Sequence, residues 1–368
     1  MFRGLLITTI VVYLAIALGC AFSTAGDGPP LPNDWKSHVR QPPPASRGER
    51  AIGLPMRGAA MQVQRNDWIE TEYRKSIDEI ADLGADSVFF VVDAHQENAG
   101  STTIYLDMRL MPTPDQLGSL VDYAKSKKLR VMLMPIVLLD RPRTYSEWRG
   151  TIRPDDWSAW WESYRAMLHH FSWVAESHGV DVLVIGSELV STEDQAEQWE
   201  KSIGVVRKTF KGMLTYSANW DHYKEVKFWQ WLDFASMNSY YTLGEDNKVS
   251  VGQIQNNWVK YKNKLLDFQK QIGKPIFFTE VGWCSQANAA KEPWDYTQDT
   301  VPLDLDLQKR LWEGFFQSWY GVPEFGGFMI WEWPPGDGGP TNRGYTPEGK
   351  PAEKVIREWL AKERWEVK

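Results

Sequence analysis

Residues 180–188 read VDVLVIGSE, an almost wholly apolar run that ends in glycine, serine and glutamate. A continuous apolar run is typical of a parallel strand with both faces covered, whereas a strand with one solvated face alternates apolar and polar residues. Residues 275–280 read PIFFTE and end in the same way, on Glu280. The two runs predict a parallel sheet with acidic side chains at the C-terminal ends of its strands.

Eight runs of this kind recur along the chain. They cover residues 59–63, 87–92, 130–136, 180–185, 213–217, 234–237, 275–279 and 327–330. Amphipathic stretches lie between them; Thr113 and Pro114, for example, are typical of a helix N-cap and a first helical position. Strands that alternate with helices predict an α/β protein, and eight strands fit a (β/α)8 (TIM) barrel. A doubly wound open sheet is the alternative, but no glycine-rich phosphate loop follows the first run.

The composition changes along the chain and divides it into three parts. Residues 1–25 contain an uncharged apolar run from residue 5 to residue 18, which is typical of a signal peptide and short for a membrane span. Residues 26–50 contain six prolines and predict an extended linker. No second linker interrupts residues 51–368, so we expect these residues to form a single barrel domain.

Two processing routes compete for the predicted signal segment. Residues 18–20 (LGC) resemble the lipobox of bacterial lipoproteins, whose cysteine, here Cys20, becomes lipidated. Residues 23–25 (STA) offer an ordinary signal-peptide cleavage site instead, and an uncleaved anchor is the third possibility. All three predict an extracytoplasmic domain: a periplasmic or outer-surface lipoprotein anchored to the membrane through Cys20, a secreted protein, or a membrane-tethered one.

The overall composition excludes several function classes. The 368 residues include 41 basic and 48 acidic side chains, so the net charge of −7 argues against a nucleic-acid partner. Two cysteines cannot form a disulfide framework or a Cys-rich zinc site. The chain also has no H-E-x-x-H, G-x-S-x-G, Walker or dinucleotide motif, so we expect neither a metal ion nor a cofactor.

Glu188 and Glu280 directly follow the fourth and the seventh predicted strand. In a barrel the C-terminal strand ends meet around one mouth, where these two strands stand nearly opposite each other. Hydrolysis of a glycosidic bond needs one carboxyl group that protonates the leaving oxygen and a second that attacks the anomeric carbon or activates water. The pair therefore predicts a glycoside hydrolase. A carbohydrate-binding barrel that has lost activity is the alternative, but such a site has no need for two opposed carboxyl groups.

Other polar and aromatic residues follow the same strand ends. Aromatic rings suit the apolar faces of pyranose sugars, and amide and hydroxyl groups suit sugar hydroxyls. The candidate substrate-binding residues are Asp93, His95, Ser187, Asn219, Trp220, Asn238, Tyr240, Tyr241, Trp283, Trp331 and Trp333. Glu332 lies between two of these tryptophans and is expected to point away from the mouth. Residues 336–344, rich in glycine and proline, are expected to border the cleft.

The chain contains twenty tryptophans, and not all of them follow a strand. Those in predicted helices are expected to pack the helices onto the barrel, because large aromatic side chains are common in protein interiors. These helix tryptophans include Trp157, Trp160, Trp161, Trp173 and Trp312.

Four strand-end segments together resemble a known family. Residues 184–189 (VIGSEL) resemble the strand-four acid/base segment of clan A glycoside hydrolases, and residues 279–283 (TEVGW) resemble the strand-seven nucleophile segment. Residues 216–220 (YSANW) and 328–333 (FMIWEW) narrow the resemblance to glycoside hydrolase family 113, which includes endo-β-1,4-mannanases. The resemblance extends over residues 53–359.

This resemblance implies a retaining mechanism with assigned roles. Glu188 would act as the general acid and then the general base, and Glu280 as the nucleophile that forms a glycosyl-enzyme intermediate. Tyr240 or Tyr241 matches the tyrosine that hydrogen-bonds the nucleophile in the clan. Trp331 matches the aromatic residue that lines the subsite for the attacked sugar.

One position departs from the pattern of the clan. Ser187 stands where clan A enzymes commonly place the asparagine that contacts the sugar 2-hydroxyl. A serine hydroxyl reaches less far, and it is the axial 2-hydroxyl that distinguishes mannose from glucose. The resemblance predicts β-1,4-mannan or manno-oligosaccharides as the substrate, with another clan A β-glycan as the alternative.

Overall fold

The computed structural model describes residues 53–297, 300–336 and 338–368. The predicted signal segment, the predicted lipidation site at Cys20 and the predicted linker all lie outside these residues. Within the part of the chain that is described, no helix is both long enough and apolar enough to cross a membrane.

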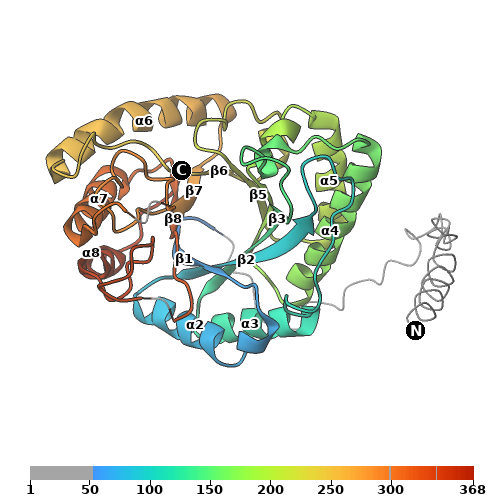
Figure 1. Ribbon diagram of the computed structural model, residues 1–368, viewed down its shortest axis with the longest axis horizontal. Helices are drawn as coiled ribbons and strands as arrows, with labels where there is room; N and C mark the ends of the chain where they lie inside the picture. Colours follow the sequence, from blue (N-terminus) through green and yellow to red (C-terminus); the bar gives the residue numbers. More distant parts are fainter. Residues whose placement is uncertain (1–52, 298–299, 337) are drawn as a thin grey trace, which may run out of the picture. The chain divides into compact units, whose positions relative to one another are not determined.

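Eight parallel strands close into a barrel, in which each strand pairs with the next in sequence and the last pairs with the first (Figure 1). The strands are β1 (Met56–Gln62), β2 (Ser87–Gln96), β3 (Arg130–Leu139), β4 (Val182–Ser187), β5 (Met213–Ala218), β6 (Ala235–Asn238), β7 (Ile276–Val281) and β8 (Phe325–Ile330). Each of the eight predicted runs overlaps one of these strands. The predicted (β/α)8 barrel is confirmed.

Two neighbouring strands are longer than the sequence pattern predicts. The pairing of β2 with β3 continues past the apolar runs, from Asp93 opposite Ile136 to Gln96 opposite Leu139. Asp93 and His95 therefore lie inside β2 rather than after it. Strand pairing, which depends on the neighbour, decides where these strands end.

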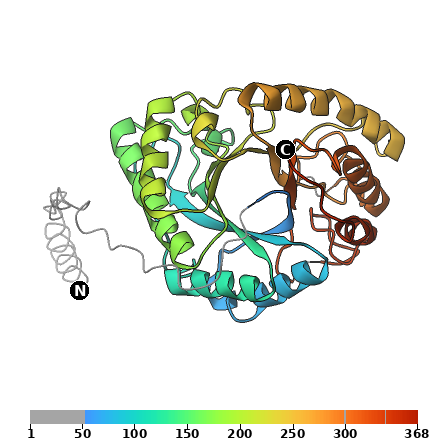
Figure 2. The ribbon, with the colours of Figure 1, turned by 180° about the vertical axis from the view of Figure 1, so that it is seen from behind.

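Helices surround the barrel, and all but the last of them connect consecutive strands (Figures 1 and 2). They are α2 (Glu72–Asp82), α3 (Pro114–Ser126), α4 (Trp157–Ser177), α5 (Ala196–Thr209), α6 (Val251–Ile272), α7 (Leu305–Trp319) and α8 (Pro351–Leu360). The alternation is interrupted once, because β5 and β6 are joined by an irregular segment with only a short 3-10 turn, η5 (Trp229–Trp231). Thr113 caps α3 by accepting a hydrogen bond from the Gln116 backbone, as the sequence predicts.

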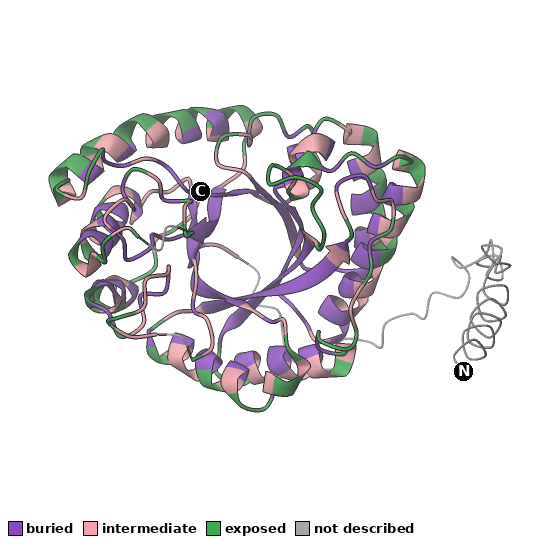
Figure 3. Ribbon diagram, viewed as in Figure 1, coloured by how far each residue is buried: buried purple, intermediate pink, exposed green. Residues whose placement is uncertain are grey.

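The core has two layers. Side chains inside the barrel, such as Met56, Phe89 and Phe277, form one cluster, and a larger cluster lies between the strands and the helices. The helices turn their buried residues toward the barrel and their exposed residues outward (Figure 3). The helix tryptophans belong to the outer cluster, in which Trp160 and Trp312 are fully buried, so their predicted packing role is confirmed.

Candidate active site

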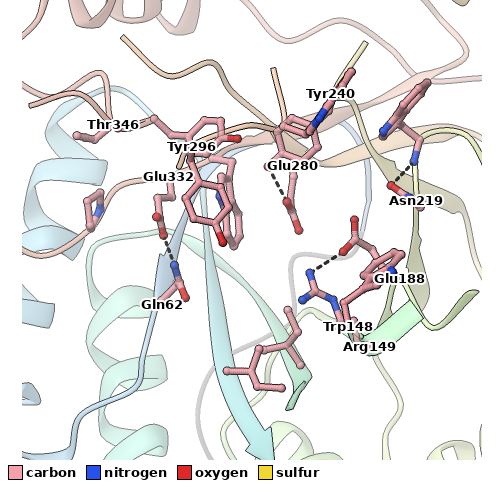
Figure 4. A pocket seen from close by; sticks show the side chains of 18 of the residues that line it. Gln62, Trp148, Arg149, Glu188, Asn219, Tyr240, Glu280, Tyr296, Glu332 and Thr346 are labelled. Carbon is pink, nitrogen blue, oxygen red and sulfur yellow. Dashed lines mark hydrogen bonds and ion pairs between the residues drawn. The ribbon is translucent and has the colours of Figure 1, made fainter. Parts of the chain in front are cut away.

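A cavity of about 750 Å³ opens at the C-terminal ends of the strands (Figure 4). Its lining comes from the ends of β1, β3 and β7 and from segments that follow β3 to β8. The lining residues are Gln62, Ile136, Leu138, Trp148, Arg149, Glu188, Asn219, Trp220, Tyr240, Glu280, Trp294, Tyr296, Trp331, Glu332, Pro334, Asn342, Gly344, Tyr345 and Thr346. The predicted contribution of the 336–344 segment to the cleft is confirmed by Asn342 and Gly344.

Glu188 reaches the cavity through an irregular end of β4. Val184 pairs with Thr215, but the next pair joins Ser187 to Ser217, so β4 has one residue more than β5 at this point. Glu188 then adopts a left-handed conformation with φ of 53°, which costs a non-glycine residue free energy unless its surroundings hold it. Such bulges turn side chains in directions that a regular strand does not allow. Here the bulge and the turn direct the Glu188 carboxyl group into the cavity (Figure 4).

Two donors hold the Glu188 carboxyl group. The Arg149 guanidinium donates to Glu188 Oε2 at 2.6 Å, and the Asn238 amide donates to Oε1. Arg149 belongs to a 3-10 turn, η3 (Arg149–Thr151), in the segment between β3 and α4. Asn238 is fully buried at the end of β6, and its amide oxygen accepts the Trp220 backbone N–H at 2.7 Å. Asn238 therefore orients the Glu188 carboxyl group through a hydrogen bond but does not itself line the cavity.

Glu280 also lies next to an irregular pairing. Met237 of β6 pairs with Phe278 of β7, and the next residue, Asn238, pairs with Glu280, so β7 has the extra residue. The Tyr240 hydroxyl donates to Glu280 Oε2 at 2.8 Å. Glu280 Oε1 is buried and has no hydrogen-bond partner among the described residues. Glu280 lines the cavity, and this oxygen is the one that its protein neighbours leave unpartnered.

Burial dominates the ionisation of Glu280. The loss of solvent raises its pKa well above the ordinary value, and the negative charge of Glu188 raises it further. The Tyr240 hydrogen bond and the positive charge of Arg149 lower the pKa but do not cancel the effect of burial. Tyr240 and Arg149 are therefore the neighbours that favour the ionised form of Glu280.

Aromatic side chains form much of the cavity wall. Trp220 and Trp294 stack with ring centroids 6.0 Å apart and planes at 12°, and Trp331 lines the same cavity. Trp294 and Tyr296 come from the segment that follows β7, and both side chains are well exposed. Flat aromatic surfaces of this kind suit the apolar faces of sugar rings.

Three predicted aromatic contacts are not in the cavity lining. Trp283 is fully buried and packs edge-on against Trp312 of α7. Trp333 is buried on the helix side, where its indole N–H donates to Glu79 of α2 at 3.0 Å. The Tyr241 hydroxyl donates to the Trp220 carbonyl at 3.2 Å, away from Glu280. The structure thus corrects the predicted sugar contacts of these three residues, because each side chain packs against or hydrogen-bonds to other parts of the protein instead.

Besides Asn238, three other predicted polar contacts lie outside the lining. Asp93 is nearly buried and accepts a hydrogen bond from Gln64 at 3.2 Å. His95 pairs with Asp140 at 2.8 Å at the rim. Ser187 is buried as the last residue of β4, and it precedes the turn that directs Glu188 into the cavity. Asn219, Trp220, Tyr240 and Trp331, by contrast, are brought into the lining.

Glu332 lines the cavity, so its predicted orientation away from the mouth was wrong. Strand β8 ends at Ile330, so the alternation of side chains no longer applies two residues later. Gln62 donates to Glu332 Oε2 at 2.7 Å on the wall that Figure 4 shows across from Glu188. Glu332 is a third carboxyl group of the cavity, and its charge contributes to the raised pKa of Glu280.

Several lining residues were missed in the sequence, above all Trp148, Arg149, Trp294 and Tyr296. They belong to the segments that follow β3 and β7, and barrel topology brings such segments to the mouth. That topology was the one available signal, and it does not say which residue of a long loop points inward. In the described part of the chain, no three His, Cys, Asp or Glu side chains are grouped to hold a metal ion.

Comparisons with known proteins agree with this arrangement. The model of Glycoside Hydrolase Family 113 matches residues 59–350. A solved structure described as a GH113 β-1,4-mannanase complex is 27% identical, with a TM-score of 0.76, and the match covers 85% of this chain and all of that one. A GH113 β-mannanase from Alicyclobacillus acidocaldarius is 28% identical, with a TM-score of 0.75 and coverage of 84% of this chain and 98% of that one.

A more distant structure, an endo-β-1,4-mannanase from Thermotoga petrophila, shares the fold at 11% identity and a TM-score of 0.54, over 84% of this chain and 77% of that one. No curated protein matches the sequence. The family model spans most of the barrel, including both glutamates and every strand end that lines the cavity. The chain therefore belongs to glycoside hydrolase family 113 and is a glycoside hydrolase.

Proposed function

We propose that the protein hydrolyses β-1,4-linked mannan or manno-oligosaccharides with retention of anomeric configuration. The observation that carries this proposal is that Glu188 and Glu280 enter one aromatic-lined cavity from β4 and β7, with one Glu280 oxygen unpartnered. The similar GH113 structures, which are described as β-1,4-mannanases, support the choice of substrate.

In the first step, Glu280 Oε1 attacks the anomeric carbon, and the bond between that carbon and the glycosidic oxygen breaks. Glu188 donates its proton to the departing oxygen, which leaves as a sugar hydroxyl. The product is a glycosyl ester on Glu280 with inverted configuration. Tyr240 keeps its hydrogen bond to Glu280 Oε2 and so orients the attacking oxygen.

In the second step, Glu188 accepts a proton from water, and that water attacks the anomeric carbon from the opposite face. The ester bond breaks, Glu280 leaves as a carboxylate, and the second inversion restores the original configuration. Arg149 and Tyr240 support this step, because both favour the ionised form of Glu280. The stacked Trp220 and Trp294 and the ring of Trp331 would hold the sugars flanking the cleaved bond.

The first test uses two alanine variants and an activated substrate, 2,4-dinitrophenyl β-mannobioside. Glu280→Ala should lose at least about 10³-fold in kcat/KM, because no nucleophile remains. Added azide should restore turnover and give an α-mannosyl azide, because azide displaces the leaving group directly. Retained turnover without azide would remove Glu280 from this role.

Glu188→Ala is the matched variant. With β-mannan oligosaccharides it should lose about 10²- to 10⁴-fold in kcat/KM, but it should lose far less with the activated substrate, whose leaving group needs no proton. Azide should now give the β-mannosyl azide, because it attacks the intermediate on Glu280. The same azide anomer from both variants, or equal losses on both substrates, would contradict the assignment.

We also propose that the enzyme acts outside the cytoplasm. The apolar run at residues 5–18 and the lipobox-like residues 18–20 support this proposal. Membrane fractionation of cells that produce the wild type or Cys20→Ser tests the lipid anchor: the anchored form should leave the membrane fraction only in the variant. Activity confined to the cytoplasm in both cases would contradict the proposal.

A further inference from the structure

A second buried carboxyl group, Glu193, lies behind the cavity. It directly follows a 3-10 turn, η4 (Val190–Thr192), in the segment after β4, and its residue surface is 1% exposed. Its Oε1 accepts a hydrogen bond, but its Oε2 is buried without a partner among the described residues. Burial raises the pKa of Glu193 to about 7. An apolar residue would avoid the cost of burying this group, so its presence calls for a reason other than stability.

The hydrogen bond of Glu193 leads to Tyr216. The Tyr216 hydroxyl donates to Glu193 Oε1 at 2.8 Å and accepts the Leu189 backbone N–H at 2.7 Å. A hydroxyl has a single proton, so the acceptor it faces decides where its lone pairs point. Because Glu193 accepts the hydrogen bond from the Tyr216 hydroxyl, a lone pair of that hydroxyl points toward the N–H of Leu189, the residue after Glu188.

Two consecutive residues of β5 hold the turn at Glu188. The Ser217 carbonyl accepts the Glu188 N–H at 2.8 Å, and the Tyr216 hydroxyl accepts the Leu189 N–H. Glu188 itself has the left-handed φ of 53°. A conformation of this kind persists only when the surrounding contacts fix it. The bond from the Leu189 N–H to Tyr216 fixes the turn from its far side, next to the Thr192 hydroxyl, which donates to the Leu189 carbonyl at 2.7 Å.

We propose that Tyr216 and Glu193 are positioning residues, which hold the left-handed turn at Glu188 and thereby aim its carboxyl group at the glycosidic oxygen. This inference rests on the proposed role of Glu188 as the general acid. Neither residue lines the cavity or touches the substrate. They reach Glu188 through the backbone at Leu189 and, in the case of Glu193, also through its charge.

The packing around Tyr216 makes a clean test possible. Its ring lies among Trp199, Phe228 and Trp229, and a phenylalanine can occupy the same space. Tyr164 offers a matched control, because it is equally buried and also packs against Trp199. The Tyr164 hydroxyl donates to the Ile185 carbonyl, within the irregular stretch of β4, rather than to Glu188 or Leu189. Tyr216→Phe and Tyr164→Phe each remove one buried hydroxyl from the same aromatic cluster.

The decisive measurement is the dependence of kcat/KM on the leaving group. Tyr216→Phe should lose about 10- to 100-fold with β-mannan oligosaccharides, because a misplaced acid protonates the leaving oxygen poorly. It should lose less than about threefold with 2,4-dinitrophenyl β-mannobioside, which needs no proton. Tyr164→Phe should lose less than about threefold on both substrates, at a comparable change in Tm.

A pair of Glu193 variants tests the hydrogen bond between Glu193 and Tyr216. Glu193→Gln keeps an oxygen that accepts from Tyr216 and should stay within about threefold of the wild type on both substrates. Glu193→Leu has a similar size but no acceptor, so it should reproduce the selective loss of Tyr216→Phe even if its Tm rises. A more stable but selectively impaired Glu193→Leu cannot be explained by a damaged fold.

The outcome for Glu188→Ala separates the inference from the function on which it rests. If Glu188→Ala shows the selective loss and Tyr216→Phe behaves like Tyr164→Phe, the positioning inference is overturned while the function stands. Equal losses on both substrates for Tyr216→Phe would overturn it as well. If Glu188→Ala itself shows no selectivity, the proposed general acid is wrong and the inference fails with it.

Discussion

The hydrogen bond from Tyr240 to Glu280 makes a quantitative prediction for Tyr240→Phe. Both side chains are buried and the bond is 2.8 Å long. Burial raises the pKa of the Tyr240 phenol well above its ordinary value, so the phenol stays a donor throughout the working pH range. Hydrogen bonds to charged groups contribute about 1.5–3 kcal/mol. Removing this one should disfavour ionisation of Glu280 by about 10- to 100-fold.

The direction of the pH effect follows from the proposed mechanism. The nucleophile must be ionised, and the Tyr240 hydrogen bond lowers the pKa of Glu280. Its loss raises that pKa, so the acid limb of kcat/KM should move to higher pH. Below the limb, kcat/KM should fall by about 10- to 100-fold relative to the wild type. Above the limb, where Glu280 is ionised in both proteins, the loss should be much smaller.

The assay is the pH dependence of kcat/KM with 2,4-dinitrophenyl β-mannobioside, because this substrate removes the need for acid catalysis by Glu188. Tyr241→Phe is the matched control: it alters the next residue, equally buried, whose hydroxyl reaches the Trp220 carbonyl instead. The control should leave the acid limb in place. An unmoved limb in Tyr240→Phe, or an equal movement in Tyr241→Phe, would refute the reasoning.

Three other variants test, in turn, the ionisation of Glu280, the sugar contact of Trp294 and the packing role of Trp283. Glu280→Gln should unfold at a higher Tm than the wild type at about pH 8 and at a similar Tm at about pH 4. The folded protein raises the pKa of the Glu280 carboxyl group, so the wild type loses stability as the pH rises above the ordinary carboxyl range. The glutamine variant has no carboxyl group at this position and does not lose this stability. Trp294→Ala should raise KM for manno-oligosaccharides several-fold, because the ring lines the cavity, and leave Tm nearly unchanged, because the residue is 45% exposed. An unchanged KM would contradict a contact between Trp294 and the sugar. Trp283→Ala should do the opposite, lowering the free energy of unfolding by about 3–5 kcal/mol through an internal cavity, and a denaturant titration that shows no loss would contradict its packing role.

Barrel strands were predictable because their signal is local. A strand covered on both faces must be apolar along its length, and that requirement is visible in the sequence wherever the strand lies. The ends were less predictable, as β2 shows: its last residues are paired with β3 although Asp93 and His95 are polar. Pairing with a neighbour is a long-range property, and no local pattern contains it.

The site was predictable to the extent that it follows from strand ends. Glu188 and Glu280 were found because barrel topology brings these ends together. Arg149 and Trp294 were not, since the path of a long segment depends on contacts such as the stacking of Trp294 on Trp220. The error at Glu332 has a different origin. Strand alternation predicts that Glu332 points away from the mouth, but β8 ends at Ile330 and the alternation ends with it.

The excess of tryptophan and the buried carboxyl groups are best understood together. Glu193 and Glu280 each bury an oxygen without a partner among the described residues, and Glu188 holds a strained backbone. Each of these features lowers stability, so the rest of the fold must compensate. The aromatic cluster beneath β4 and β5 is well placed to do so, because Trp199 packs on Tyr216 and its indole N–H donates to the Thr192 carbonyl, the residue before Glu193. On this reasoning, Trp199 of α5 stabilises the segment that carries Glu193 and the turn at Glu188, although it does not line the cavity.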